Sequence, residues 1–196
     1  MNNELIEQLK NNVKEALKED NYRYFHTLGV ANTSACLAMR YHFNMETAYI
    51  AGLMHDCAKC VPEDVMLSEC NQYGIEVSES EHVSPYLLHA KLGAYYTRTR
   101  YHIDNDDICN AIRYHTTGRA NMSILEKIVF IADYIEPSRN KVSNLDVVRQ
   151  MAFEDLDRTV YKISQDTLSY LEKKGGTIDP ATNETYEYYS QLQTES

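Results

Sequence analysis

Glycine and proline are scarce in this chain, with 7 and 4 residues respectively among 196. A collagen-like, linker-rich or intrinsically disordered chain would contain more of both, and 43% of the residues here are hydrophobic. The length is close to that of one ordinary domain. We therefore expect a single compact domain with a sizeable core, and not two large domains.

Basic residues are also fewer than acidic residues. The 19 Lys and Arg residues are outnumbered by 29 Asp and Glu residues, so the formal net charge at pH 7 is −10. Proteins that bind the nucleic-acid backbone without regard to sequence need a basic surface, so that function is not expected. A phosphate ligand would have to be met by a local cluster of cations or by metal ions.

Long hydrophobic runs are missing, and the best one, Ile128–Ala132, is followed directly by Asp133. A membrane-spanning helix needs about 18 apolar residues or more, so no membrane insertion is expected. The first residues lack the basic segment and apolar stretch of a signal peptide, and the cysteines number 5, which is odd. We expect a cytoplasmic protein with reduced thiols.

Apolar residues recur at helical spacing along most of the chain, without the sustained alternation of β-strands. The predicted fold class is therefore all-α, a single helical bundle. Ser123 and Glu126 form the capping-box pattern that opens a helix, Pro137 ends that helix, and Gly175-Gly176 is a typical end for another. The expected helices cover residues 3–18, 22–40, 45–54, 84–99, about 106–115, 124–136 and 144–174, with at most one break in the last.

Two regions have weaker periodicity. Residues 62–82 are polar and predict a loop with at most one short helix. The last twenty residues, rich in Tyr and Glu, predict a short helix and a frayed tail. We accordingly expect an N-terminal helix within 1–20 packed on the domain, the domain itself at 21–180, and a C-terminal helix or tail at 181–196.

Imidazole and carboxylate side chains lie within or at the ends of predicted helices at six positions: His26, His55, Asp56, His89, His115 and Asp133. Asp133 interrupts an apolar segment, where an ionised carboxylate is costly unless it is paired or binds metal. His55 and Asp56 end an apolar run, and His115 falls on the apolar stripe of its predicted helix. Such residues from different helices, converging on a bundle core, are how helical folds build metal sites.

Each of these histidines taken singly is more often an ordinary core or surface residue than a metal ligand. Their combination is what favours a metal site. His42, His82 and His102 have polar or aromatic neighbours and no matching pattern, so we interpret them as structural. Cys57 and Cys60 form a CxxC, but no second pair stands at the spacing of a zinc site, which argues against a zinc or redox function.

In their order along the chain, the six residues resemble the HD-domain phosphohydrolase superfamily in its six-ligand, dinuclear form. The surrounding segments look like those of one bacterial branch, the YqeK family: 23–31, 51–59, 89–94, 112–119 and 131–139. Five matching segments in order are far more specific than an isolated His-Asp pair. The chain departs from the pattern at Ala90-Lys91, where Gly-Pro is common in relatives, and after Pro180, where a more basic ending is usual.

The resemblance implies a reaction and a ligand set. YqeK proteins cleave diadenosine tetraphosphate symmetrically to two ADP, by attack of a hydroxide that bridges two metal ions. The family scheme implies that one ion is held by His26, His55, Asp56 and Asp133, and that Asp56 bridges to a second ion held by His89 and His115. Family precedent points to iron, and four imidazoles with two carboxylates also suit manganese or another borderline cation.

The leaving nucleotide gains negative charge in the transition state, which calls for fixed cations nearby. Lys59 and Arg119 are the first candidates, and with Asp56 they form the expected catalytic set. The further candidates for phosphate contacts are Arg23, Arg139, Thr116 and Gly118.

Two alternative functions stay open. One is another HD-type nucleotide phosphohydrolase with the same site. The other is a nucleotide-binding regulator without turnover, against which the complete ligand set argues. A homodimer is expected by analogy with some family members.

Overall fold

The computed structural model describes residues 3–140, 144–175 and 177–194. Regular structure in these ranges consists of helices alone, which confirms the all-α prediction. In chain order they are α1 (Asn3–Ala16), α2 (Asn21–Arg40), α3 (Met45–Met54), α4 (Glu63–Gln72), α5 (Glu79–Val83), the 3-10 helix η1 (Pro85–Leu87), α6 (Leu88–Thr99), α7 (Asp106–Arg113), α8 (Ile124–Ile135), α9 (Leu145–Ala152), α10 (Leu156–Lys174) and α11 (Pro180–Thr194).

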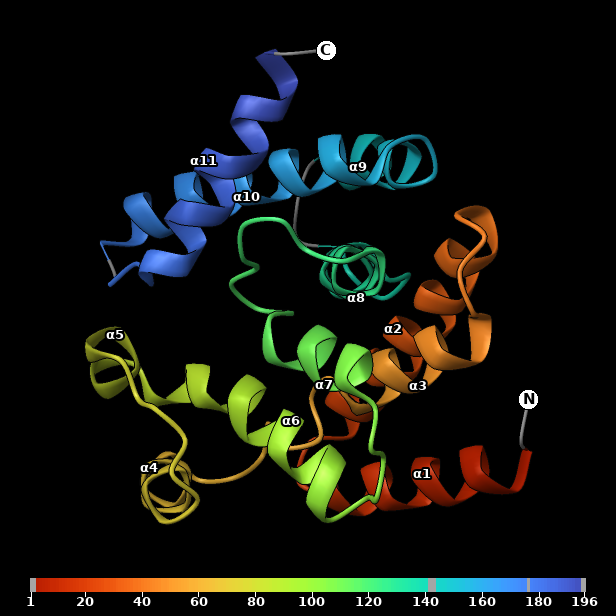
Figure 1. Cartoon of the computed structure of the whole chain (residues 1–196), viewed down its shortest axis with the longest axis vertical. Helices are drawn as coiled ribbons and strands as arrows, with labels where there is room; N and C mark the ends of the chain where they lie inside the picture. Colours follow the sequence, from red (N-terminus) through yellow and green to blue (C-terminus); the bar gives the residue numbers. More distant parts are fainter. Residues whose placement is uncertain (1–2, 141–143, 176, 195–196) are drawn as a thin grey trace.

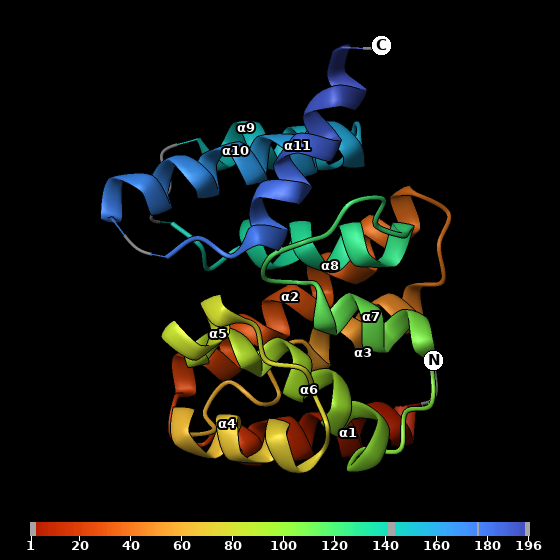
Figure 2. The same cartoon turned by 60° about the vertical axis from the view of Figure 1, so that its left-hand side comes forward.

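Helix α8 lies in the middle of the molecule, between α9, α10 and α11 at one end and α1 and α4 at the other (Figures 1 and 2). Its sequence is apolar on most sides, and most of its residues are buried against α2, α3, α7 and α10. Ser123 and Glu126 exchange side-chain and backbone hydrogen bonds at its start, so the predicted capping box is present.

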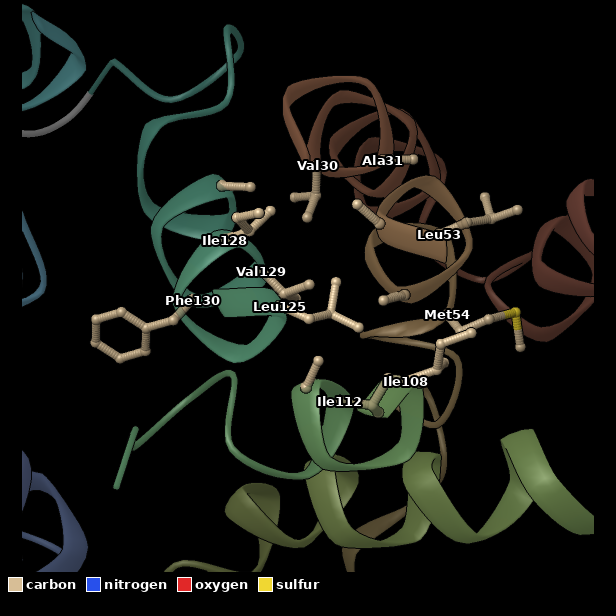
Figure 3. Close-up of a cluster of buried hydrophobic side chains, with 14 of the residues drawn as sticks. Val30, Ala31, Leu53, Met54, Ile108, Ile112, Leu125, Ile128, Val129 and Phe130 are labelled. Atoms are coloured by element: carbon tan, nitrogen blue, oxygen red, sulfur yellow. The ribbon is translucent and has the colours of Figure 1, made fainter. Parts of the chain in front are cut away.

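The core between α2, α3, α7 and α8 is apolar and closely packed. Val30, Leu53, Ile112 and Leu125 are each 1% exposed or less. In Figure 3, Val30 and Leu125 point into the space between the helices, and Leu53 packs on the side of α3 that faces away from α8. Burial of each such side chain contributes about 1.5–3 kcal/mol to stability. Phe130, by contrast, points away from this cluster on another side of α8 (Figure 3).

Helices α2 and α3 lie against each other and begin at capped ends. The side chains of Asp20 and Asn44 each accept a backbone N–H of the following helix. Helix α3 is buried along most of its length and ends at Met54, as predicted. This places His55 and Asp56 at the inner end of a buried helix.

The segment 62–82 is more helical than the sequence predicts. Both α4 and α5 lie in it, so the expected loop with at most one short helix is wrong. In α4 the buried residues are Met66 and Cys70, one turn apart, which is too few to give a strong periodic signal. Ser78 and Glu81 form a second capping box that starts α5.

Two other predicted helices differ at their ends. The helix expected at 84–99 begins as η1 and becomes α-helical at Leu88. Helix α7 ends at Arg113, so His115 lies in the following turn and not on the helix stripe. His115 is nevertheless 3% exposed, because its ring turns back and bonds the Ile112 carbonyl oxygen at 2.7 Å.

The C-terminal third forms a packed end of the molecule. The predicted long helix is broken between α9 and α10, where Asp155 caps α10, and it ends at left-handed Gly175 as expected, while Gly176 lies outside the described residues. The expected short helix and frayed tail is wrong over the described residues, because α11 has 15 residues and packs on α10. Its Tyr189 is 1% exposed and accepts the Met122 N–H at 2.9 Å.

Helix α1 packs against α3 through Ile6, Leu9 and Val13. Residues 1–2 and 195–196, the extremes of the predicted terminal segments, lie outside the described ranges. Among the described helices, none is long and apolar enough to cross a bilayer.

Candidate metal centre

The six predicted ligands come together from five parts of the fold. His26 comes from α2, His89 from α6 and Asp133 from α8, while His55 and Asp56 follow α3 and His115 follows α7. The four imidazoles and Asp56 are each 3% exposed or less, whereas the Asp133 side chain is 23% exposed. The carboxylate of Asp133 therefore lies at the open side of an otherwise buried cluster.

Asp56 faces imidazoles with both of its carboxylate oxygens. Its Oδ2 lies 3.4 Å from His55 Nε2, and its Oδ1 lies 3.2 Å from His89 Nε2 and 3.6 Å from His115 Nε2. A carboxylate with ligand nitrogens on both oxygens has the arrangement that bridges two metal ions.

Asp133 closes the cluster on the α2 side. Its Oδ1 lies 2.9 Å from His26 Nε2 and 3.9 Å from His55 Nε2. Candidate ligand atoms fall within 4.8 Å of one another in three overlapping groups: His26 with His55 and Asp56, His55 with His115 and Asp133, and Asp56 with His89 and His115.

Hydrogen bonds at Nδ1 fix the ring orientation of three of the four histidines. Three Nδ1 atoms lie within hydrogen-bond distance of the carbonyl oxygen three residues earlier: His55 to Gly52 at 2.7 Å, His89 to Tyr86 at 2.5 Å and His115 to Ile112 at 2.7 Å. A carbonyl oxygen only accepts, so Nδ1 carries the proton and Nε2 offers its lone pair to the cluster. Metal-bound histidines are oriented in this way.

The buried atoms of the cluster fit metal ions. Nε2 of His26 and of His55 are buried without a hydrogen-bond partner, which is costly unless a cation takes their lone pairs. Burial lowers the pKa of His89 to about 4, so its imidazole is neutral as a ligand must be.

Both carboxylates are held in the ionised form. Burial by itself would raise the pKa of Asp56, but the imidazoles of His55, His115 and His89 hold that pKa well below its usual range. For Asp133, the same cost of burial is outweighed by His26, His55 and the Arg139 guanidinium, which hold its pKa well below the usual range.

Three of the predicted phosphate-binding cations lie against the cluster. Arg23 donates to Asp56 Oδ2 at 3.0 Å, and Arg139 donates to Asp133 Oδ1 at 2.7 Å. The Lys59 Nζ lies 3.2 Å from His89 Nε2, and burial lowers the pKa of this ammonium group. Thr116 Oγ1 is 3.1 Å from His115 Nε2.

The other two predicted contacts lie elsewhere. Arg119 donates from Nε and Nη2 to the two carboxylate oxygens of buried Glu126, each at 2.9 Å. Gly118 adopts φ 67°, and a Cβ there would come within 2.7 Å of the Thr185 side chain in α11. Both residues therefore have a structural explanation at the start of α8 and beside α11.

A cavity of about 210 Å³ adjoins the cluster. Its polar wall includes Asp133 and Arg139, and its apolar wall includes Phe130, which Figure 3 shows pointing away from the core. A larger cavity of about 500 Å³ lies along α6 and α7, where two of its three cations, Lys91 and Arg98, are already paired with carboxylates.

Glu136 is a residue that the sequence analysis gave no role. It is 1% exposed, and its Oε1 lies 3.0 Å from His26 Nδ1. The cost of burial on its pKa is outweighed by hydrogen bonds from Ser138 and by His26, so its pKa lies below the usual value. The local sequence carries no signal for this contact, because Glu136 follows the end of α8 and its partner His26 lies 110 residues earlier.

Comparison with known proteins agrees with this geometry. The HD domain family matches residues 23–138, a range that contains all six candidate ligands. The chain belongs to the HD-domain family. HD domains bind divalent metal ions, and this HD domain has the His/Asp cluster to hold them.

Relatives of this HD-domain chain share most of its length. A protein of Bacillus subtilis named symmetrical bis(5'-nucleosyl)-tetraphosphatase is 38% identical, over 90% of this chain and 92% of the relative. Proteins with the same name from Halalkalibacterium halodurans and Staphylococcus aureus are 40% and 36% identical, over 89% and 94% of this chain and 91% and 94% of their own lengths.

A solved structure has the same fold. The crystal structure of a predicted HD superfamily hydrolase from Clostridium acetobutylicum, described as involved in NAD metabolism, superposes with a TM-score of 0.91 at 37% identity. The match covers 95% of this chain and 97% of the other. The HD-domain bundle and the membership of the YqeK-type branch are thereby confirmed.

Proposed function

We propose that this chain is a metal-dependent phosphohydrolase that cleaves diadenosine tetraphosphate symmetrically into two ADP. The observation that carries the proposal is the position of Asp56, whose two oxygens face His55 on one side and His89 with His115 on the other. The names of the relatives from three bacteria supply the substrate class and the symmetry of the cleavage.

In this proposal the six side chains hold two ions. His26, His55 and Asp133 would hold the first, His89 and His115 would hold the second, and Asp56 would be shared between them. When bound, such a pair of ions activates a water molecule as nucleophile and polarises the phosphoryl group for in-line displacement. Iron is the proposed metal, and manganese or another borderline cation suits the same imidazole and carboxylate donors.

The chain's own cations then receive the polyphosphate. Arg23, Lys59 and Arg139 lie directly against the ligands, so a phosphate bound there would meet three positive side chains in a chain of net charge −10. Thr116 would add a hydroxyl hydrogen bond to a phosphate oxygen. These groups would stabilise the charge that develops on the leaving ADP.

The reaction balances with water as the second substrate. The bond between the second and third phosphates breaks, the oxygen of water joins one of these two phosphorus atoms, and both halves leave as ADP. The cavity beside Asp133 and Arg139 would take one nucleoside against Phe130 and Tyr134.

Arg119 and Gly118 stay predictions as substrate contacts. Arg119 would reach substrate only by leaving Glu126, to which it is bonded through two nitrogens. Homodimer formation and a cytoplasmic location are likewise proposals that rest on the family resemblance and on the sequence.

The test is product analysis. Iron-loaded protein is incubated under reducing conditions with diadenosine tetraphosphate in ¹⁸O-labelled water, and the nucleotides are separated by chromatography and weighed by mass spectrometry. ADP as the sole product is the expected result. One of the two ADP molecules from each substrate molecule should carry one ¹⁸O atom. ATP with AMP would contradict symmetrical cleavage, and no turnover by metal-loaded protein would favour another HD-type nucleotide hydrolase or a binding protein.

A further inference from the structure

The Nδ1 atoms of the four imidazoles in the metal centre do not all have the same kind of hydrogen-bond partner. His55, His89 and His115 each use a carbonyl oxygen of their own segment, three residues earlier. The ring of His26 instead faces the carboxylate of Glu136, which is 110 residues away in sequence and 3.0 Å away in space. A charged acceptor makes the ring a stronger donor to a metal than a neutral carbonyl does.

The Glu136 carboxylate is fixed in place on both oxygens. The Ser138 backbone N–H donates to Oε2 at 2.7 Å, and the Ser138 hydroxyl donates to Oε1. Gly29 of α2 leaves the space that this carboxylate fills, since a Cβ there would overlap Oε2. A buried carboxylate with this much support has a defined orientation toward His26.

Glu136 also changes the charge balance between the two halves of the centre. The first half-site (His26, His55, Asp56, Asp133) has four protein ligands, and the second half-site (Asp56, His89, His115) has three. Arg23 and Arg139 oppose two carboxylates at the first, and the Lys59 Nζ lies against the His89 ring at the second. Glu136 adds one further negative charge behind the first half-site alone.

We propose that Glu136 is a positioning residue that makes the first half-site the tighter metal site, so that the two ions bind with unequal affinity. The proposal rests on the dinuclear centre of the proposed function, and it adds an order of occupancy and the residue that sets it. Outer hydrogen-bond partners of metal-bound histidines typically change metal affinity by about 10- to 100-fold.

The experiment withdraws metal from the intact protein. The full chain is loaded with Mn²⁺ in the absence of nucleotide and titrated with a competing chelator, and released Mn²⁺ is followed by its electron paramagnetic resonance signal. The wild type is expected to lose its ions in two steps. Asp133→Asn should remove the tighter step and His89→Ala the weaker one, which assigns the steps to the half-sites.

The deciding variant is Glu136→Gln, which keeps the shape and an acceptor oxygen but removes the charge. Its tighter step should weaken about 10- to 100-fold, while the weaker step stays within about threefold of the wild type. The matched control is Glu81→Gln, because Glu81 is also a buried carboxylate, but it caps α5 and binds Lys91 and no candidate ligand. Both steps of the control should equal the wild type.

Several results would overturn the proposal. They are equal affinity for both ions in the wild type, unchanged release from Glu136→Gln, a shift confined to its weaker step, or equal shifts in Glu136→Gln and Glu81→Gln. If Glu136→Gln does not fold, Ser138→Ala replaces it: loss of the hydroxyl donor should weaken the tighter step several-fold, and no change would overturn the inference. The titration contains no nucleotide, so a wrong substrate assignment would appear in product analysis and leave these results intact.

Discussion

Carboxylates lie at both ends of α8, and their surroundings differ. At the N-terminal end, Glu126 is 1% exposed, and its oxygens accept from Arg119 and from the Ser123 N–H. At the C-terminal end, Asp133 faces imidazoles, and Nε2 of His26 is buried there without a hydrogen-bond partner.

The difference shows what separates a structural charge from a functional one. Burial alone does not, since Glu126, at 1% exposed, is as buried as His26 and His89. At the first end the donors and acceptors match within the protein, which is the arrangement of a stabilising cap. At the second end the carboxylates accept from Arg23 and Arg139, but the Nε2 atoms of His26 and His55 have no donor, which leaves their lone pairs for metal ions.

The variant with the largest expected effect is Asp56→Ala, which tests whether the cluster holds metal ions. Because both half-sites share Asp56, the variant should lose bound metal and lower hydrolysis by at least about 10³-fold. Helical content should stay close to that of the wild type, as measured by circular dichroism beside metal analysis and product analysis. Retained activity in this variant would contradict the dinuclear mechanism.

The arginines at the two ends of α8 test the same difference between a functional and a structural site. Arg139→Ala should lower kcat/KM by about 10²-fold, since Arg139 lies on the cluster at Asp133. Arg119→Ala, its matched counterpart at Glu126, should lower kcat/KM less than about tenfold. Steady-state kinetics with diadenosine tetraphosphate measures both, and a larger loss for Arg119 would reverse the assignment and restore it as a catalytic residue.

Metal removal should lower the Tm of the protein, because the ions would bind the folded cluster at the C-terminal end of α8. An ion present at about 100 times its dissociation constant adds about 2.7 kcal/mol, which for a chain of this size raises Tm by about 5–10 °C. Calorimetry with and without a chelator should show that difference in the wild type and none in Asp56→Ala. The same shift in Asp56→Ala would mean that metal binds elsewhere.

The smallest expected effect is at the structural end. Glu126→Ala removes a capping partner and leaves Arg119 without its carboxylate, so the free energy of unfolding in urea should fall by about 2 kcal/mol. Metal content should be unchanged. Glu15→Ala, at an exposed ion pair with Lys18, should change stability by less than about 0.5 kcal/mol. Metal loss from Glu126→Ala would contradict a purely structural cap.

The sequence predicted the helical class and the gathering of the six ligands because both depend on patterns that persist along the chain. Helical periodicity and the Ser123–Glu126 cap are local, and the ligand motifs match the family segment by segment. The positions of His55 at the end of α3 and of Asp133 within α8 followed from the apolar runs that contain them.

The errors occurred where packing decides the outcome. Helix α4 rests on few buried residues, and α11 buries Tyr189, whose hydroxyl made the segment look like a polar tail. Glu136 was missed because its partner His26 comes from a helix more than a hundred residues earlier. No local sequence pattern reports that contact. In the fold, Gly29 is explained by it, because a Cβ there would overlap the Glu136 carboxylate.

The most direct test of the dinuclear centre is an anomalous-scattering map from crystals of the metal-loaded protein, combined with metal analysis of the same sample. Two ions per chain that share Asp56 are expected, one beside His26 and Asp133 and the other beside His89 and His115. A single ion, or two ions that do not share Asp56, would contradict this arrangement.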